Sequence, residues 1–139
     1  MKYLGLDLGT RTLGVAISDL THTIANTYKT IRYEEENYDY LIEELKKIIE
    51  IENVNIIVLG LPKNMNNTLG ESAVRCLNFK EMIEKKLNIE VVMQDERLTT
   101  VEATNYMIEA NISRKKRKQK IDSLAANIIL QSYLDRKKD

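Results

Sequence analysis

Apolar and polar positions alternate along the first third of the chain in a way that predicts strands. A two-residue period of apolar side chains is typical of strands with one buried face. Three such strands are expected, at residues 3–8, 14–18 and, less regularly, 24–33. A short connection containing Gly9 joins the first two, which suits antiparallel pairing. The chain is therefore expected to open as a meander of three strands.

The remainder alternates between helical and continuous apolar segments. Apolar residues recur at helical spacing over 38–49, and a continuous apolar run at 54–59 ends at Gly60. A helix at 71–87 and a strand at 89–94 follow. Thr99 and Glu102 form a capping box, which predicts a helix over 99–110. The inner face of the last helix is expected at Ile121, Leu124, Ala125, Ile128 and Ile129.

This order of elements predicts an α/β fold with a mixed five-stranded sheet and helices on both faces. Right-handed crossovers put the fourth and fifth strands beside the first, so the expected strand order is 3-2-1-4-5. With 139 residues and 43% hydrophobic content, the chain is expected to form a single domain over 1–139.

Acidic residues stand where the central strands end. Asp7 closes the first strand, Asp95 and Glu96 follow the fifth, and Asp122 lies near the start of the last amphipathic helix. The carboxyl ends of parallel strands share one rim of an open sheet, so these acids are expected to converge there. A carboxylate in apolar surroundings needs a cation, a donor or water. The pattern therefore indicates a divalent metal that acts on a phosphate ester.

Strand spacing divides the roles of the acidic pair. The first and fifth strands would lie about 9.5 Å apart, so the longer Glu96 reaches back toward Asp7 more easily than Asp95. Asp95 suits the cap of the following helix. Gly5 is expected to leave a gap beside Asp7, and Gly60, which has no side chain, is expected to leave space for a metal between the two strands.

Each acid also has an ordinary structural role as an alternative. Asp7 could pair with Arg11 at the turn, and Glu96 could pair with Arg97 or Arg11. Asp122 could be an exposed acid in the first turn of a helix, where the helix dipole favours it.

Charge is balanced overall but not locally. The chain has 21 basic and 21 acidic residues, yet residues 114–120 read RKKRKQK, with six bases and no acid. Such a block needs solvent or an anionic partner, and its place just before Asp122 favours contact with a polyanion over a solvated helix start. The candidate substrate-binding residues are Thr10, Arg11, Lys63, Asn64, Arg97, Arg114, Lys115, Lys116, Arg117 and Lys118.

Other chemistry is largely excluded by composition. The single Cys76 allows no internal disulfide and is expected to be buried in a reducing compartment. The lone His22 is expected in a surface turn, and no Cys or His cluster suggests zinc. No apolar run approaches the ~18 residues of a membrane span, and no signal-peptide pattern begins the chain. A cytoplasmic protein without a membrane partner is expected.

Four segments together resemble the YqgF/RuvX family of Holliday junction resolvase-like nucleases. They read GLDLGTRTLGVAISD, GLPKNMNNTLGE, DERLTTVEA and IDSLAANIILQSYLD, and with their spacing they cover essentially the whole chain. The resemblance implies an RNase H fold, a nuclease that trims the 5′ end of pre-16S ribosomal RNA in ribosome biogenesis, and a metal site built from Asp7, Asp95-Glu96 and Asp122. One departure, Asn66-Asn67-Thr68 where the family has a small residue or Gly, bears on substrate grip.

We therefore expect phosphodiester hydrolysis assisted by one or two Mg²⁺ or Mn²⁺ ions on Asp7, Glu96 and Asp122, with Asp95 in support. The alternatives are a resolvase-like DNA nuclease and a non-catalytic assembly factor that binds nucleic acid on the pre-ribosomal particle. An actin-like phosphotransferase shares Asp7-Leu8-Gly9-Thr10, but that fold needs two lobes and 139 residues give one. RNA or DNA as substrate, endo- or exonuclease action, and monomer or homodimer stay open.

Overall fold

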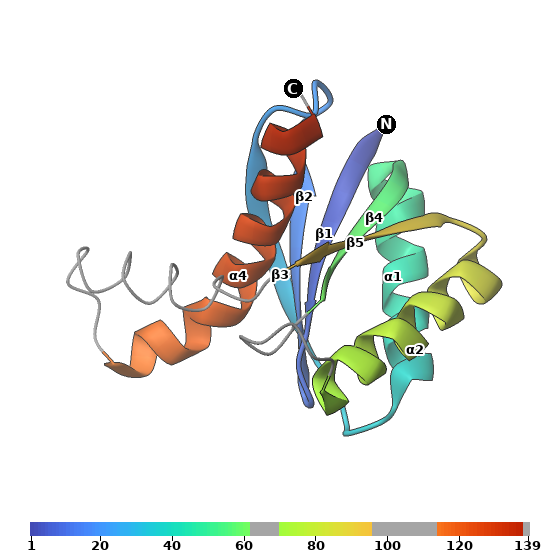
Figure 1. Ribbon diagram of the computed structural model, residues 1–139, viewed down its shortest axis with the longest axis vertical. Helices are drawn as coiled ribbons and strands as arrows, with labels where there is room; N and C mark the ends of the chain where they lie inside the picture. The colour runs from blue at the N-terminus through green and yellow to red at the C-terminus, as the bar shows by residue number, and fades with distance from the viewer. Residues whose placement is uncertain (62–69, 96–113, 138–139) are drawn as a thin grey trace.

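The computed structural model describes residues 1–61, 70–95 and 114–137 (Figure 1). Its elements follow the expected order, and most bounds lie within two residues of the predicted ones. In chain order they are β1 (Lys2–Leu8), β2 (Thr12–Ser18), β3 (Ala25–Arg32), α1 (Tyr38–Glu52), β4 (Val54–Leu61), α2 (Glu71–Leu87), β5 (Glu90–Asp95) and α4 (Arg114–Lys137). The helix predicted at 99–110 lies outside the described residues.

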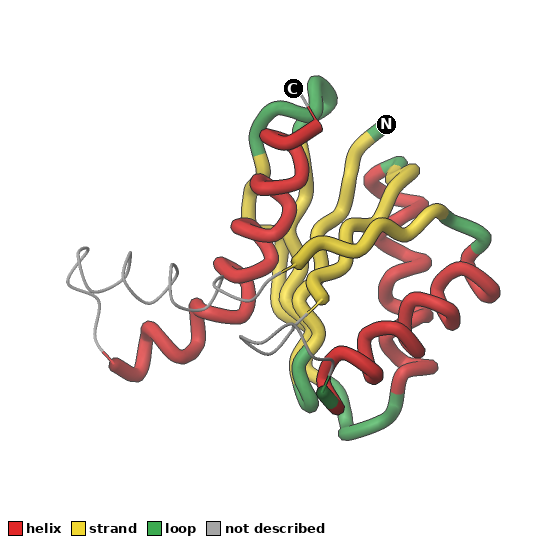
Figure 2. The backbone as a smooth tube through the Cα atoms, in the orientation of Figure 1, coloured by secondary structure: helices red, strands yellow, loops and turns green. Residues whose placement is uncertain are grey.

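The strands form one mixed sheet in the order β3-β2-β1-β4-β5, so the predicted order is confirmed. β1 is antiparallel to β2 and parallel to β4, and β5 is parallel to β4. Helices α1 and α2 cover one face of the sheet and α4 covers the other (Figure 2). The carboxyl ends of β1, β4 and β5 consequently share one rim of the sheet.

The two faces of the sheet bury separate cores. Leu4, Leu6 and Leu8 alternate along β1 toward α1 and α2, where they join the larger core. Tyr3 points the other way and packs in the smaller core beneath α4. The α4 residues of that smaller core are Ala126, Ile129, Leu130 and Leu134. Two-residue alternation thus assigns the odd-numbered positions of β1 to the α4 side.

Asparagines end the two helices that lead into parallel strands. Asn53 and Asn88 adopt left-handed conformations, with φ of 60° and 51°, and their N–H groups donate to the carbonyls of Ile49 and Glu84. Asn tolerates this conformation better than most residues, so it ends a helix well. The chain then turns within three residues into β4 or β5.

Helix α4 corrects two expectations. It begins at Arg114 rather than near Ile121, so the basic block 114–120 forms its first two turns. Ala125 and Ile129 are buried as expected, but the buried face also includes Ala126 and Leu130, whereas Leu124 and Ile128, expected on the inner face, are only half-buried. The physical reason is that small Ala126 lets the helix approach the sheet, which the apolar spacing alone does not reveal.

Gly5 is the point where α4 meets β1. A Cβ added at Gly5 would come within 2.6 Å of the Leu130 Cβ and 2.9 Å of the Ala126 carbonyl oxygen. Both distances are shorter than van der Waals contact, so the helix occupies the space that a side chain would need. The expectation that Gly5 leaves a gap beside Asp7 is therefore wrong, because α4 fills that gap.

The turn that joins β1 to β2 is held by three hydrogen bonds. The Gly9 N–H donates to the Thr12 carbonyl at 2.8 Å, and the Tyr33 N–H donates to the Arg11 carbonyl at 3.0 Å. The Tyr33 hydroxyl donates to the Gly9 carbonyl. Burial raises the pKa of this hydroxyl to about 12. Tyr33 therefore anchors the segment that directly follows Asp7.

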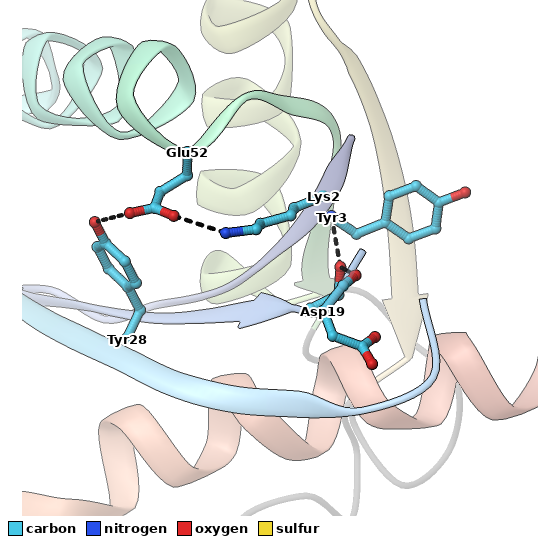
Figure 3. A network of polar contacts seen from close by, with 6 residues as sticks. Lys2, Tyr3, Asp19, Tyr28 and Glu52 are labelled. Carbon is cyan, nitrogen blue, oxygen red and sulfur yellow. Dashed lines mark hydrogen bonds and ion pairs between the residues drawn. The ribbon is translucent and has the colours of Figure 1, made fainter. Parts of the chain in front are cut away.

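The opposite end of the sheet is closed by a separate polar network (Figure 3). The Glu52 carboxylate accepts hydrogen bonds from Lys2 Nζ at 3.0 Å and from the Tyr28 hydroxyl at 3.2 Å, which ties the end of α1 to β1 and β3. Ser18 Oγ accepts from the Tyr3 N–H at 2.8 Å. These contacts fix the strand ends that lie farthest from Asp7.

We expect Gly5→Ala to lower the free energy of unfolding by about 1–3 kcal/mol, because the added methyl overpacks the α4 contact. Urea denaturation measures the loss. Gly9→Ala is the matched control: its methyl would meet two Thr12 oxygens at 3.2 Å, so a small local shift relieves it and the loss should be smaller. A Gly5→Ala protein as stable as wild type would contradict this account of the helix contact.

We expect Tyr33→Phe to cost about 1 kcal/mol near neutral pH, the usual worth of a hydrogen bond. Because the folded pKa of Tyr33 is raised from 10.0 to about 12, its stabilising effect is complete below pH 10 and is lost as the pH rises from about 10 to 12. Urea denaturation of both proteins between about pH 8 and 11 should show the wild-type advantage shrinking above pH 10. A constant advantage over that range would refute the assignment.

Candidate functional site

Asp7 lies near the end of β1, with a glycine beside it on each neighbouring strand. It is half-buried and, by alternation with Tyr3 and Gly5, belongs to the α4 side of the sheet. Its partner across β2 is Gly14. On the other side the register pairs Leu6 with Leu59, so Gly60 of β4 follows beside Asp7. A glycine therefore flanks this carboxylate on each neighbouring strand.

Next to Gly60, on β5, lies Gln94, so Asp7, Gly60 and Gln94 form a row across three strands. The register pairs Gly60 with Gln94, and the residues two positions earlier, Val58 and Val92, pack in the core beneath α4. Asp7, Gly60 and Gln94 thus lie side by side on the α4 side of three strands. The expectation that Gly60 lies between β1 and β5 next to Asp7 is confirmed, while space for a metal there stays a prediction.

Gln94 is the residue at this site that the sequence did not single out. It is 8% exposed, and its Oε1 is buried without a hydrogen-bond partner in the part of the chain that the structure describes. The signal that could have found it is a polar residue inside an otherwise apolar strand, one position before Asp95-Glu96. The row of Asp7, Gly60 and Gln94 therefore contains one charged oxygen donor, Asp7, and one neutral one, Gln94.

Helix α4 packs on β1 just before Asp7, and it does so with a defined direction. Ala126 and Leu130 lie over Gly5, and the Tyr133 ring lies 6.1 Å from the Tyr3 ring, so later helix residues meet earlier strand residues. Figure 1 shows the end of α4 and the start of β1 at the same end of the molecule. Where it packs on the sheet, the helix therefore runs antiparallel to β1, whereas its first turns, orange in Figure 1, bend away from the strands.

The other expected site residues divide into three groups. Thr10 and Arg11 are exposed in the turn after β1. Asp95 ends β5 opposite Leu61, and Asp122 and the basic block lie in α4, but only the backbone of these positions is described. Lys63, Asn64, Glu96 and Arg97 lie outside the described residues. Among the residues whose side chains the structure describes, no group of three or more His, Cys, Asp or Glu could hold a metal.

Two minor expectations are confirmed away from the row. Cys76 is fully buried as a free thiol. His22 lies in the loop between β2 and β3 with a φ of 59°, and its ring stacks on Tyr3 at 4.0 Å between centroids. None of the described helices is long and apolar enough to cross a membrane.

Comparison with known proteins gives sequence relatives of nearly full length. A protein of Clostridium botulinum strain Hall named "Putative pre-16S rRNA nuclease" is 53% identical to this chain over 135 residues, which covers 97% of each chain. The Staphylococcus haemolyticus relative is 50% identical over 135 residues, covering 96% of this chain and 95% of its own.

Solved structures share the fold at low sequence identity. RuvC of Thermus thermophilus in complex with a Holliday junction substrate has a TM-score of 0.59 at 11% identity, covering 99% of this chain and 96% of RuvC. The fowlpox virus resolvase bound to Holliday junction DNA has a TM-score of 0.59 at 13% identity and covers 100% of both chains. These likenesses show a RuvC-like, RNase H-type resolvase fold.

A family model agrees with these relatives. The model for RuvX, described as Holliday junction resolvase, matches residues 1–136. The sequence resemblance, the strand order and the fold therefore lead to one conclusion: this chain belongs to the RuvX family.

Proposed function

We propose that this chain is a divalent-metal-dependent nuclease that hydrolyses phosphodiester bonds, with the 5′ end of pre-16S ribosomal RNA as its substrate and the cytoplasm as its place of action. The observation that carries the proposal is Asp7, a half-buried carboxylate between Gly14 and Gly60 at the carboxyl ends of parallel strands, in a RuvX-family chain. Ligands of open α/β sheets bind at such an edge. The relatives' name supports the substrate.

The direction of α4 supports Asp122 as a second ligand. From Gly5 to Asp7 the strand advances about 6.6 Å. From Ala126, which lies over Gly5, back to Asp122 the helix advances about 6 Å in the same direction. The near equality favours position 122 beside Asp7, one turn before a buried helix residue. It weighs against the alternative of an exposed acid in a first turn, since α4 begins eight residues earlier.

Strand alternation supports Glu96 rather than Asp95 as the third ligand. Val91 and Met93 pack toward α1 and α2, whereas Val92 packs beneath α4 and Gln94 shares its set of positions. If this alternation continued one residue past the end of β5, position 95 would face α1 and α2 and position 96 would face the side of Asp7. We therefore keep Glu96 as the ligand and Asp95 in a supporting role.

The donors fit a hard cation. Carboxylate oxygens are the ligands that Mg²⁺ and Mn²⁺ prefer, and Asp7 provides one such group at this edge of the sheet. Asp7, Glu96 and Asp122 would hold one or two such ions, which supply a lowered pKa for an attacking water and charge stabilisation for the leaving oxygen. The protein's own part would be to hold these carboxylates at the edge of the sheet on the α4 side.

The basic block supports binding of a nucleic-acid backbone. Its six cations occupy the first two turns of α4, immediately before the proposed ligand Asp122. Cations there would contact phosphates that flank the scissile one, and such contacts fix register without reading bases. Selectivity would then come from the shape of a structured RNA or from the pre-ribosomal particle.

A second candidate function is cleavage of branched DNA. Fold likeness to two resolvases crystallised with Holliday junctions favours it. One assay separates the candidates: the purified protein with Mn²⁺ is given the 5′ leader of pre-16S RNA, an unstructured RNA of equal length and a four-way DNA junction. Preferential leader cleavage supports our proposal, and preferential junction cleavage supports the resolvase. Binding without cleavage of any substrate would indicate a non-catalytic assembly factor.

Asp7→Asn should abolish hydrolysis and weaken Mn²⁺ binding while the fold stays intact, because the central carboxylate loses its charge. Stability could rise as repulsion among the acids falls. Leader cleavage and calorimetric titration with Mn²⁺ measure the two effects. Asp135→Asn, at an exposed position of the same α4, is the control and should change neither. Wild-type cleavage by the Asp7→Asn protein would remove Asp7 from the site.

The remaining acids should rank by role in the same assay. Asp122→Asn should lose less activity than Asp7→Asn, and Glu96→Gln should lose more than Asp95→Asn. Equal losses of activity at positions 95 and 96 would show that the ligand role does not belong to Glu96 alone.

Replacing Lys115, Lys116 and Lys118 by Gln should weaken binding to RNA and DNA alike. Each phosphate that the protein neutralises releases counterions, so the slope of log affinity against log salt should flatten by about 0.7–0.9 for each phosphate that is no longer neutralised. Fluorescence anisotropy at several salt concentrations gives the slope. The control replaces exposed Lys46, Lys47 and Lys85 on α1 and α2, which changes net charge equally across the sheet. Identical slopes for the two triple variants would reject the block as the binding surface.

A further inference from the structure

Gln94 is a buried amide with an unmet hydrogen bond inside the proposed site. Its side chain is more than nine-tenths buried, and no described residue donates to Oε1. A buried acceptor that has lost its hydration without gaining a donor is unfavourable, so such atoms in folded proteins call for an explanation. The described part of the chain offers none.

The position of Gln94 points to where its donor would be. Gly60 separates it from Asp7 on the α4 side of the sheet, and a glycine places no side chain between the amide and the carboxylate. With β4 between them, β1 and β5 lie about 9.5 Å apart. That separation is long for two residues to share one cation directly, but a water between them spans it.

We propose that Gln94 is a positioning residue of the cation site, whose Oε1 accepts a hydrogen bond from a hydration water of the cation held by Asp7. This inference rests on the proposed metal-dependent function. Mg²⁺ usually retains several waters when carboxylates bind it, and each retained water is a hydrogen-bond donor. Residues that hold such waters tune metal affinity from outside the ligand set.

Asn55 serves as a control for the effect of an unpaired buried amide oxygen that lies far from the proposed site. Asn55 Oδ1 is the other buried side-chain oxygen without a partner among the described residues. It lies at the start of β4, five residues before Gly60 and so roughly 16 Å along the strand. If only the burial of an unpaired amide oxygen mattered, substitutions at Gln94 and Asn55 would change Mn²⁺ affinity alike.

The test measures Mn²⁺ affinity by calorimetric titration, and melting temperature with and without Mn²⁺, for Gln94→Leu, Gln94→Glu and Asn55→Leu. We expect both leucine variants to melt at or above the wild-type temperature without metal, because each removes an unpaired polar atom. Gln94→Leu should bind Mn²⁺ roughly 10-fold more weakly or worse, and Asn55→Leu should bind as wild type does. Gln94→Glu keeps an acceptor and adds charge, so its affinity should be retained or raised.

Three results would overturn the inference, and they are distinguishable. Unchanged Mn²⁺ affinity in Gln94→Leu, while Asp7→Asn loses it, would leave the metal site standing without Gln94. Equal loss in the Leu and Glu variants would indicate disturbed packing instead of a missing acceptor. A wild-type protein that binds no Mn²⁺ would overturn the proposed function as well. If Gln94→Leu does not fold, Gln94→Met, closer in length to glutamine, provides the same comparison.

Discussion

Helix α4 lies against β1 at Gly5, and the arrangement of the site depends on that contact. The Ala126 carbonyl and the Leu130 Cβ occupy the volume that a side chain at position 5 would fill. The helix is thereby fixed in height above the sheet and in register along β1. Everything proposed for the rim follows from this register, because it determines which turn of α4 stands beside Asp7.

Strand pairing, the turn after β1 and the larger core also fix the position of this rim. Parallel pairing of β1 with β4 and of β4 with β5 aligns Asp7, Gly60 and Gln94 in one row. Tyr33 ties down the turn that follows Asp7. The large core between the sheet and helices α1 and α2 supports the strands from the opposite face. The carboxylate therefore stands on a rigid sheet, which suits a site that must hold its ligands in fixed positions.

The sequence predicted the strand order because each strand carries its own period and crossover handedness leaves few topologies. It predicted α2 over 71–87 with the bounds observed. It missed the start of α4, because a run of Lys, Arg and Gln has high helix propensity but no apolar period. It also misread the function of Gly5, since a missing side chain looks the same in a sequence whether a metal or a helix fills the space. The buried face of α4 and the orphaned amide of Gln94 depend on that tertiary contact.

In our proposal, α4, packed on Gly5, brings Asp122 beside Asp7 so that both bind one divalent cation. Diffraction from crystals grown with Mn²⁺, recorded where manganese scatters anomalously, tests it directly. We expect an anomalous peak on the α4 side of the sheet, bonded to the carboxylates of Asp7 and Asp122 and next to Gly60. A peak elsewhere in an otherwise unchanged fold, or one bonded to Asp7 with Asp122 turned into solvent, would contradict it.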